Sequence, residues 1–322
     1  MFNRAHLPAV CAAVLVTAAG MASAQAWPTK PIRIVVPYAA GGPADVIARL
    51  VAKKAGDTLG QTIIVDNKAG AGGTIGVDAA LKSVPDGYTF ALTAQGPLAG
   101  MPNLMKAPYA IADIQYLTLV ARGPAVVAVS KKVAANTLQD LVKIAKAQPG
   151  KLNYGSAGPG TTPHIAGELL KQEAGIDMTH VPYKGAGPAV TGLLGGEIDV
   201  AVVDLLNVLP HVAAGNLKVL AVASPSRAPQ LPNVPTTKEA GLPNLVMDTS
   251  YGVIAPPGIP ADVQAKFRDA IVGAVQSADL KEQMIKQGVV PLTTSAQDYR
   301  AAIQAESDKW KRVISTARIT LE

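Results

Sequence analysis

The sequence predicts an α/β protein with two lobes, each built around a largely parallel sheet, and a hinge of two crossover strands between them. A nine-residue phrase occurs twice, at residues 36–44 and 181–189, and six of its positions are identical. A β-rich run precedes each copy and a helical pattern follows it, which predicts a strand–loop–helix unit in each half. The length of 322 residues is enough for two domains of ordinary size.

Strands and helices are expected to alternate in the N-terminal third. Apolar β-rich runs predict strands at residues 32–38, 62–66 and 89–93, and helical spacing predicts helices over 45–59 and from 75 to 81. This β-α-β-α-β order is typical of a parallel sheet with helices on its faces.

The middle of the chain repeats this alternation. A helix is expected over residues 137–147, because Thr137 suits the N-cap and Asp140 stands at the capping-box distance. A second helix is expected over 163–174, after a glycine-rich loop. The strands expected here lie at 125–129, 152–155, 178–181, 200–203 and 218–223.

The C-terminal part begins with an irregular segment. Five prolines interrupt residues 225–245, so no long regular element is expected there. A strand is expected at 250–255. Two terminal helices follow it, one after Pro260 and one from about Ser295.

These elements predict that the chain crosses twice between the lobes. Residues 25–122 together with 250–322 are expected to form lobe 1, and residues 123–249 lobe 2. The crossover strands are expected near 120–126 and 249–254. The cleft between the lobes is the natural place for a ligand.

The first 24 residues have the features of a secretion signal. Arg4 supplies the positive charge, residues 7–19 form a short apolar stretch, and Ala22-Ser23-Ala24 fits the small-x-small cleavage rule. We therefore expect a periplasmic protein, cleaved after Ala24. Cys11 is the only cysteine and lies within this signal, so no disulfide, thiolate nucleophile or cysteine metal ligand is expected.

The charge pattern argues against nucleic-acid binding. The formal net charge is +6, and removal of Arg4 leaves 28 − 23 = +5. The basic residues are scattered, with at most two adjacent, so no basic block is available for a nucleic acid. A mild positive field suits small anions better. We expect no cofactor and no metal, since His164, His180 and His211 are far apart in sequence and none pairs with another ligand at i, i+4.

Three glycine loops, at residues 39–43, 69–74 and 155–162, each lie between a predicted strand and a predicted helix. A glycine loop that opens a helix presents free backbone N–H groups and the positive end of the helix dipole to an anion. The spacing fits neither a dinucleotide fingerprint nor a P-loop. In the third loop Ser156, Thr161 and Thr162 offer hydroxyl groups for a carboxylate clamp. The alternative is that Thr162 is only an N-cap and Ser156 only a turn residue.

Several single residues have two interpretations. Asp45 is expected to cap free N–H groups of the first loop rather than bind ligand. Lys184 either pairs with a ligand carboxylate or is solvated. Asp204, at the end of a buried-looking strand, either accepts a hydrogen bond from the ligand or caps the next segment. His164 is expected to be a helix-start residue satisfied by backbone. Ser156 as a nucleophile would make the chain a secreted hydrolase, although the Gly-x-Ser-x-Gly elbow is absent.

Seven motifs are distributed over nearly the whole mature chain. They are Trp27-Pro28-Thr29-Lys30-Pro31-Ile32-Arg33, Val36-Pro37-Tyr38-Ala39-Ala40-Gly41-Gly42, Gly70-Ala71-Gly72-Gly73, Pro85-Asp86-Gly87-Tyr88, Leu152-Asn153-Tyr154-Gly155-Ser156-Ala157-Gly158, His180-Val181-Pro182-Tyr183-Lys184-Gly185 and Leu231-Pro232-Asn233-Val234-Pro235-Thr236. Together they resemble the Bug family, the periplasmic solute-binding receptors of tripartite tricarboxylate transporters. The resemblance implies a type II periplasmic-binding-protein-like fold, a small organic carboxylate or dicarboxylate held between the lobes, and membrane transporter subunits as partners. A signalling receptor without transport would share the same residues.

The resemblance also implies which residues bind the ligand, mostly through backbone groups, with Asp204 as a side contact. Two departures from the family pattern, Pro43-Ala44 before Asp45 and Leu205 after Asp204, make the cleft less polar. We therefore expect a ligand with an apolar or aromatic body, bound by a monomer. The implied binding residues are Tyr38, Ala40, Gly42, Gly70, Ala71, Gly72, Gly73, Ser156, Thr161, Thr162 and Asp204.

Overall fold

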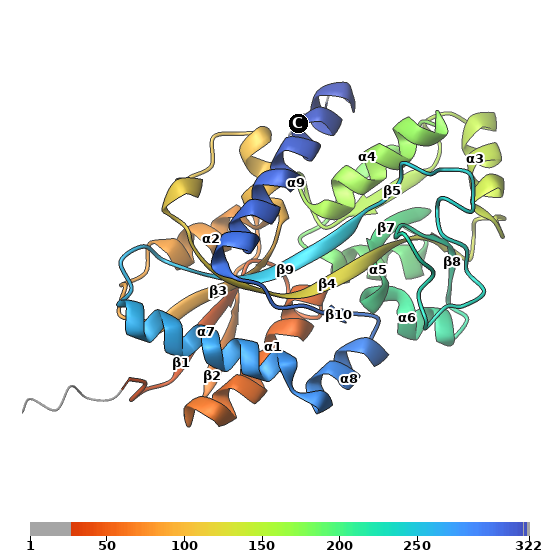
Figure 1. Cartoon of the computed structure of the whole chain (residues 1–322). Coiled ribbons are helices and arrows are strands. Elements are labelled where there is room, and N and C mark those ends of the chain that lie inside the picture. Colours follow the sequence, from red (N-terminus) through yellow and green to blue (C-terminus); the bar gives the residue numbers. More distant parts are fainter. Residues whose placement is uncertain (1–26, 318, 321–322) are drawn as a thin grey trace, which may run out of the picture.

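The computed structural model describes residues 27–317 and 319–320, so the predicted signal and its cleavage site lie outside the described residues. Two α/β halves lie side by side, and strands β4 (Gln115–Ser130) and β9 (Asp248–Ala255) run between them (Figure 1). The halves contain a mixed α/β fold, as predicted. No helix of the described residues is long and apolar enough to cross a membrane.

The strands form one continuous path in the order β2-β1-β3-β9-β4-β7-β5-β6, with β8 and β10 paired to β4. β1 pairs in parallel with β2 and β3, and β5 pairs in parallel with β6 and β7. The pairs that involve β4 or β9 are antiparallel. The remaining strands are β1 (Ile32–Val36), β2 (Ile63–Asn67), β3 (Thr89–Ala94), β5 (Asn153–Ser156), β6 (Thr179–Pro182), β7 (Val200–Asp204), β8 (Leu217–Val222) and β10 (Val290–Pro291).

Strand β4 belongs to both halves of the sheet. It pairs with β9 as far as Pro124, opposite Asp248, and then pairs with β7 from Ala125, opposite Asp204. The strand is longer than the predicted 125–129, because it extends through Gly123-Pro124 back to Gln115 and includes the crossover expected near 120–126. Pro124 is tolerated since it lies where β4 changes partner.

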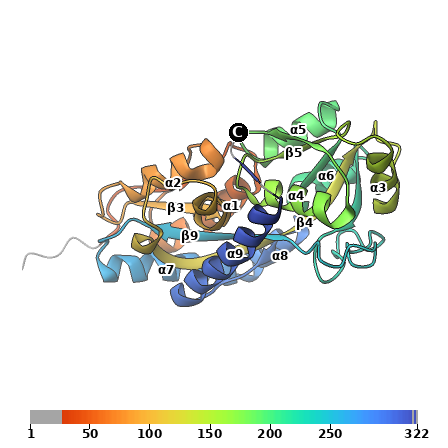
Figure 2. The same cartoon turned by 90° about the horizontal axis from the view of Figure 1, so that it is seen from above.

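Helices cover both faces of the sheet. Helices α2 and α9 pack in the same core cluster on one face, and α1 and α7 pack in a second cluster on the other face. Figure 2 shows α2 and α7 in one half of the molecule and α3, α5 and α6 in the other. Two helices were not predicted. Helix α6 was missed because Pro210 lies inside it, and α8 makes three C-terminal helices where two were expected. The helices are α1 (Pro43–Leu59), α2 (Thr74–Leu81), α3 (Leu138–Ala147), α4 (Thr162–Ala174), α5 (Ala186–Gly195), α6 (Leu205–Ala213), α7 (Ala261–Gln276), α8 (Ala278–Lys286) and α9 (Ala296–Ala317), together with short turns at Ala71–Gly73, Gly96–Gly100, Met101–Asn103 and Ile111–Asp113.

Local sequence signals account for the ends of several helices. The predicted capping box at the start of α3 is confirmed, since Thr137 Oγ1 accepts from Asp140 N and the Asp140 carboxylate accepts from Thr137 N. Large apolar side chains fill the hydrophobic core clusters on both faces of the sheet. Phe90 of β3 stacks on Phe267 of α7 with ring centroids 3.6 Å apart. Trp310 of α9 is fully buried in the core cluster that also includes side chains of β4 and α4.

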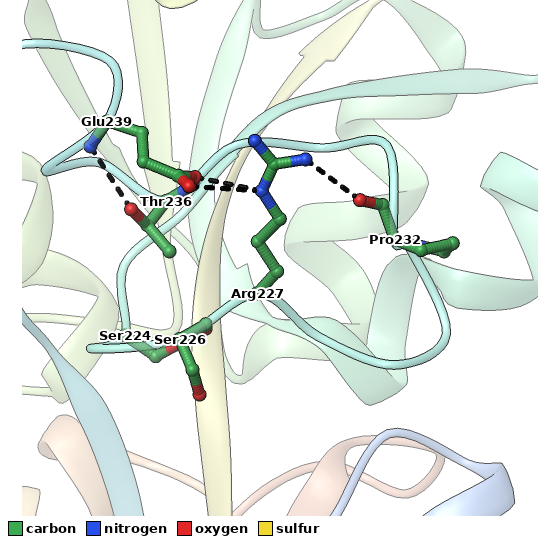
Figure 3. Close-up of polar contacts among 6 residues, drawn as sticks. All are labelled: Ser224, Ser226, Arg227, Pro232, Thr236 and Glu239. Carbon is green, nitrogen blue, oxygen red and sulfur yellow. Dashed lines mark hydrogen bonds and ion pairs between the residues drawn. The ribbon is translucent and has the colours of Figure 1, made fainter.

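The proline-rich segment 225–245 contains no helix or strand, as predicted. Its loops are tied by Arg227, whose guanidinium donates to Glu239 at 2.9 Å and to the carbonyl oxygen of Pro232 at 3.0 Å (Figure 3). Glu239 in turn accepts from the backbone N–H of Thr236 at 2.7 Å. These contacts replace the backbone ladder that the prolines prevent.

Candidate ligand-binding cleft

Four helices begin at the boundary between the two halves of the molecule. Each follows a sheet strand or the loop after one, because strand–loop–helix units place helix N-termini at the carboxyl edge of the sheet. The N-cap residues are Gly42 for α1, Thr161 for α4, Gly185 for α5 and Asp204 for α6, and none of them makes a side-chain capping hydrogen bond. Their positive dipole ends are therefore not neutralised by the protein's own N-cap side chains.

The two copies of the repeated phrase face each other across this boundary. The backbone N–H of Ala39 donates to the carbonyl oxygen of Lys184 at 3.4 Å. A Cβ atom on Gly185 would lie 3.4 Å from Ala39 N, and one on Gly42 would lie 3.9 Å from Gly187 N. The first glycine loop and the start of α5 are thus in direct contact, so the two halves are closed upon each other.

A narrow cavity of about 30 Å³ lies between these helix starts. Five of the expected binding residues line it: Tyr38, Gly42, Thr161, Thr162 and Asp204. No lysine or arginine is among its lining residues. The further lining residues are Pro43, Ala44, Ala94, Ala157, Pro163, Ala186, Thr249 and Tyr251.

The glycine loop of residues 70–73 lines a neighbouring cavity of about 180 Å³, which shares Tyr38 and Ala157 with the first. Lys184 is exposed and lines this second cavity too. Ala40 lies apart from both, in an open surface groove between α1, α5 and α6. The structure therefore brings the second loop to the cleft's edge and leaves Ala40 outside the cavity.

Thr161 and Thr162 use their hydroxyl groups differently. Thr161 Oγ1 donates to the carbonyl oxygen of Gly158 at 2.6 Å and so fixes the loop. Thr162 Oγ1 is buried, lines the cavity and has no hydrogen-bond partner among the described residues. Thr162 as the N-cap is wrong, because Thr161 occupies that position and α4 begins one residue earlier than predicted.

Ser156 is fully buried and does not line the cavity. Its Oγ accepts from the backbone N–H of Gly158 at 3.1 Å and lies 2.6 Å from His180 Nε2. The hydroxyl thus stabilises the turn. The distance to His180 alone would suit a nucleophile and its base. Burial of Oγ among these partners removes it from contact with a substrate in the cavity.

Asp204 is the one acidic residue that lines the cavity. Its carboxylate accepts from Thr249 Oγ1 at 2.7 Å and from the Tyr251 hydroxyl, both on β9. Burial raises the pKa of Asp204 to about 7 against the opposing effect of these hydrogen bonds. The protonated form of Asp204 therefore persists to higher pH than that of an exposed aspartate. The Tyr251 and Thr249 contacts gave no signal in the sequence, because they depend on the pairing of strands far apart in the chain.

Asp45 caps a free N–H group of the first glycine loop, as predicted. Its carboxylate accepts from the backbone N–H of Gly41 at 3.0 Å and from Arg49 Nε at 3.0 Å. Arg49 also donates to Asn67, whose side-chain amide donates to the carbonyl oxygen of Tyr38 at 3.1 Å. Sequence reasoning missed Arg49 and Asn67, which belong to α1 and β2 and meet only in the folded sheet.

The histidines do not assemble a metal site. Within the described residues no group of three or more histidine, cysteine, aspartate or glutamate side chains could hold a metal ion. His164 Nδ1 instead accepts from the backbone N–H of Gly160 at 3.1 Å. The prediction that backbone satisfies this helix-start residue is confirmed.

Comparison with known proteins agrees with this arrangement. A family model described as "Tripartite tricarboxylate transporter family receptor" matches residues 47–319. Protein BugT of Bordetella pertussis (strain Tohama I) is 35% identical over 317 residues, which cover 97% of this chain and 97% of BugT. The resemblance drawn from the motifs is thereby confirmed over most of the chain.

Solved structures show the same fold. One described as a periplasmic transporter superposes with a TM-score of 0.89 at 37% identity, covering 92% of this chain and 100% of that one. R. palustris Rpa4515 with adipate gives 0.88 at 32% identity, covering 91% and 99%. MatC (Rpa3494) from Rhodopseudomonas palustris with bound malate gives 0.85 at 29% identity, covering 89% and 99%.

The family consists of receptors that bind a solute for a transporter, so the alternative of a secreted hydrolase is wrong. The helix starts around one cavity, the buried Ser156 and the match over residues 47–319 all agree with a binding protein. The chain belongs to the tripartite tricarboxylate transporter receptor family.

Proposed function

We propose that this chain is a periplasmic receptor that captures a small organic dicarboxylate between its two lobes and delivers it to the membrane subunits of a tripartite transporter. The observation that carries the proposal is the convergence of four helix N-termini on one cavity, each without a side-chain cap. Free N–H groups and helix dipoles neutralise a carboxylate without a lysine or arginine. The unpartnered hydroxyl of Thr162 supplies a further donor.

Asp204 is proposed to recognise the second polar end of the ligand. In its protonated form it donates a hydrogen bond to a carboxylate, and in its ionised form it accepts one from a hydroxyl or a protonated carboxyl. Two of the solved relatives contain adipate and malate, which are both dicarboxylates. A ligand with two such ends satisfies both the helix starts and Asp204.

The body of the ligand is proposed to be apolar or aromatic. Pro43 and Ala44, the residues that depart from the family pattern, line the cavity and are buried, and Ala94, Ala157 and Pro163 add further apolar surface. An apolar wall favours a carbon skeleton without hydroxyl groups, since an unpaired buried hydroxyl costs free energy. An adipate-like or benzenedicarboxylate ligand fits better than a hydroxylated tricarboxylate.

Capture is proposed to occur by hinge closure of a monomer. Residues 25–122 with 250–322 form the first lobe and 123–249 the second, and the hinge lies in β4 and β9. Contacts such as that between Ala39 and Lys184 form only when the lobes meet, so a ligand that contacts both lobes favours the closed state. Export to the periplasm is proposed to follow from the signal at residues 1–24.

A thermal-shift screen with calorimetry tests the proposal on the mature protein. The panel contains adipate, malate, terephthalate, benzoate and citrate, with adipamide as the uncharged match of adipate and glucose as an unrelated solute. Adipate or terephthalate is expected to raise Tm in a concentration-dependent manner, as mass action requires, while adipamide leaves it unchanged. A shift produced by adipamide or glucose, and by none of the acids, would contradict the carboxylate proposal.

Uptake measurements separate a transport receptor from a signalling receptor. Cells that lack the transporter's membrane subunits are expected to lose uptake of the bound acid although the receptor still binds it. Unchanged uptake in those cells, together with a transcriptional response to the acid that needs the receptor, would assign the chain to signalling.

A further inference from the structure

Two histidine rings stack against the loop of residues 155–162 without lining the cavity. His164 lies in the first turn of α4 and His180 on β6, and their ring centroids are 4.1 Å apart with an angle of 9° between the rings. The ring of Tyr154 continues the stack at 4.9 Å from His180. His164 is only 4% exposed. His180 is half-buried, so the stack supports the loop from its less exposed side, and capture of a ligand does not require these rings to touch it.

Each histidine is connected to one glycine of the loop. Gly160 N donates to His164 Nδ1 at 3.1 Å, so this nitrogen carries no proton and the ring hydrogen is on Nε2. His180 Nε2 lies 2.6 Å from Ser156 Oγ, which accepts from Gly158 N at 3.1 Å. Gly158 and Gly160 have φ values of +121° and +67°, a region that favours glycine. The histidines thus fix the two unusual backbone positions of the loop.

These two positions determine what the loop presents to the cleft. Gly158 O accepts from Thr161 Oγ1 at 2.6 Å, and the chain then enters α4 with Thr162 facing the cavity. The carbonyl oxygen of Pro159, between the two glycines, lies 2.4 Å from where a Cβ on Gly72 would be. The backbone conformation of this loop therefore determines two things: where the N–H groups at the start of α4 point, and how closely Pro159 packs against Gly72 of the opposite lobe.

We propose that His164 and His180 are positioning residues for carboxylate capture, which hold the 155–162 loop in its binding conformation only while both rings are neutral. The proposal rests on the proposed function and adds a regulation to it, namely loss of binding in acid. Protonation of His164 would place an N–H on Nδ1 opposite the N–H of Gly160, so two donors would face each other. Protonation of both rings would also stack two positive charges at 4.1 Å.

The groups around the rings agree with neutral histidines. Burial lowers the pKa of His164 to about 3 and that of His180 to about 4. Lys171 lowers both pKa values further, whereas Glu168 opposes the shift of His180. Tyr154 completes the surroundings and donates to Glu168 at 2.6 Å. The folded state therefore binds these protons less readily than the unfolded state, whose histidines titrate near about 6.5, and stability is lost as pH falls from there toward the folded pKa values.

Two substitutions of His164 separate positioning from packing. In His164→Asn the side-chain oxygen can accept from Gly160 N, as Nδ1 does, whereas in His164→Leu the ring's apolar volume is approximated and the acceptor is lost. Calorimetry with adipate at neutral pH is expected to give near wild-type affinity for His164→Asn. For His164→Leu a loss of about tenfold or more is expected, because Gly160 N is left unpaired. Wild-type affinity in His164→Leu would overturn the proposal.

A pH profile provides the second readout and remains decisive if His164→Leu fails to fold. The double variant His164→Asn/His180→Gln has no group that titrates in the stack. Wild-type affinity for adipate is expected to fall more steeply than that of the double variant below about pH 5. Protonation of adipate and of Asp204 affects both proteins, so the difference between the profiles belongs to the histidines. Superimposable profiles would overturn the proposal.

A ligand-free measurement distinguishes failure of this proposal from failure of the proposed function. The imidazole ¹⁵N shifts of the wild type are expected to report an unprotonated Nδ1 on His164, and the Gly160 amide is expected to exchange slowly with solvent. If these hold while no carboxylate binds, the function is wrong and the histidines still shape the loop. A protonated Nδ1 at neutral pH or rapid exchange of Gly160 overturns the histidine proposal, whatever the protein binds.

Discussion

The backbone N–H of Ala39 and the carbonyl oxygen of Lys184 join the two copies of the repeated phrase through a hydrogen bond of 3.4 Å. Ala39 follows β1 and Lys184 follows β6, so the bond connects loops from opposite halves of the sheet. Gly185, next to Lys184, has a φ of +132°, a region that favours glycine, and it lies within van der Waals reach of Ala39. Backbone contacts between the two copies of the repeated phrase thus hold the two halves of the molecule together at the cleft.

Gly72→Ala is expected to weaken ligand binding by about tenfold or more, since the added Cβ would lie 2.4 Å from Pro159 O on the opposite lobe. Gly60→Ala is the matched control. Gly60 has φ of +67° against +62° for Gly72, but nothing lies within 4 Å of its added Cβ. Both variants are expected to lose about 1 kcal/mol or more of stability from the left-handed backbone. Calorimetry with adipate and urea unfolding measure the two effects, and equal affinities in the two variants would contradict closure at this contact.

Thr162→Val is expected to lower the affinity for a dicarboxylate by about tenfold without a loss of stability, because the hydroxyl of Thr162 lines the cavity and has no protein partner. Thr161→Val is expected to affect stability more than ligand affinity. Removal of its bond to Gly158 O is expected to cost about 1 kcal/mol of stability. The pair is compared by calorimetry and urea unfolding. A Thr162→Val protein that binds as tightly as wild type would remove Thr162 from the binding site.

Asp204→Asn is expected to increase stability at alkaline pH and to have little effect in acid. Burial raises the pKa of Asp204 to about 7, whereas an exposed aspartate titrates near about 3.9. The folded protein therefore keeps a proton that the unfolded chain releases between these values. Wild-type stability should fall as pH rises through this window and then level off above about 7.

Asparagine keeps one oxygen as an acceptor and replaces the other with an NH2 donor, from which the hydroxyl of Thr249 or Tyr251 can accept. Because it carries no charge, it approximates the protonated group. The difference in unfolding free energy between Asp204→Asn and wild type, measured by urea unfolding at several pH values, should grow from about pH 4 to about pH 7. A difference that does not depend on pH would show that Asp204 titrates like an exposed carboxylate.

Asp45→Asn is expected to destabilise the protein by about 1 kcal/mol at neutral pH, because the charge-assisted bond from the half-exposed Arg49 is weakened. Burial opposes the ionised form of Asp45, but the bonds from Arg49 and Gly41 outweigh it and lower its pKa. This contribution is full above the ordinary aspartate pKa and is lost as pH falls below it. Arg49→Gln is the control that keeps Asp45 charged, and equal stability of wild type and Asp45→Asn at neutral pH would contradict the role of the bond.

Most of the fold could be predicted because local patterns and tertiary structure agree in the outer strands and helices. The capping box of Thr137 and Asp140 predicted the start of α3 from four residues of sequence. The failures occur where tertiary pairing overrides a local signal. A strand was expected over 125–129, yet β4 extends back through Gly123-Pro124 because β9 and then β7 pair with it. Pro210 suggests the end of a helix, yet α6 includes it.

The sequence was sufficient to identify the loops of the candidate site, but it did not reveal which residues of these loops and strands contact one another. The repeated phrase identified the loop that contains Gly42 and the start of α5, because glycine and proline carry strong local signals. No local signal indicated that Asp204 would contact Thr249 and Tyr251, or that Ser156 would turn away from the cavity toward His180. Those contacts depend on strands that are adjacent only in space.

The absence of lysine and arginine from the residues that line the cavity has a consequence for how such receptors diversify. Main-chain donors at the helix starts belong to every sequence that adopts this fold, so the proposed anchor for the acid group survives substitution of the surrounding side chains. Pro43 and Ala44 can therefore change the shape and polarity of the remaining wall while the anchor stays in place. A bacterium can thus derive receptors for different acids from one ancestor by exchanging a few wall residues.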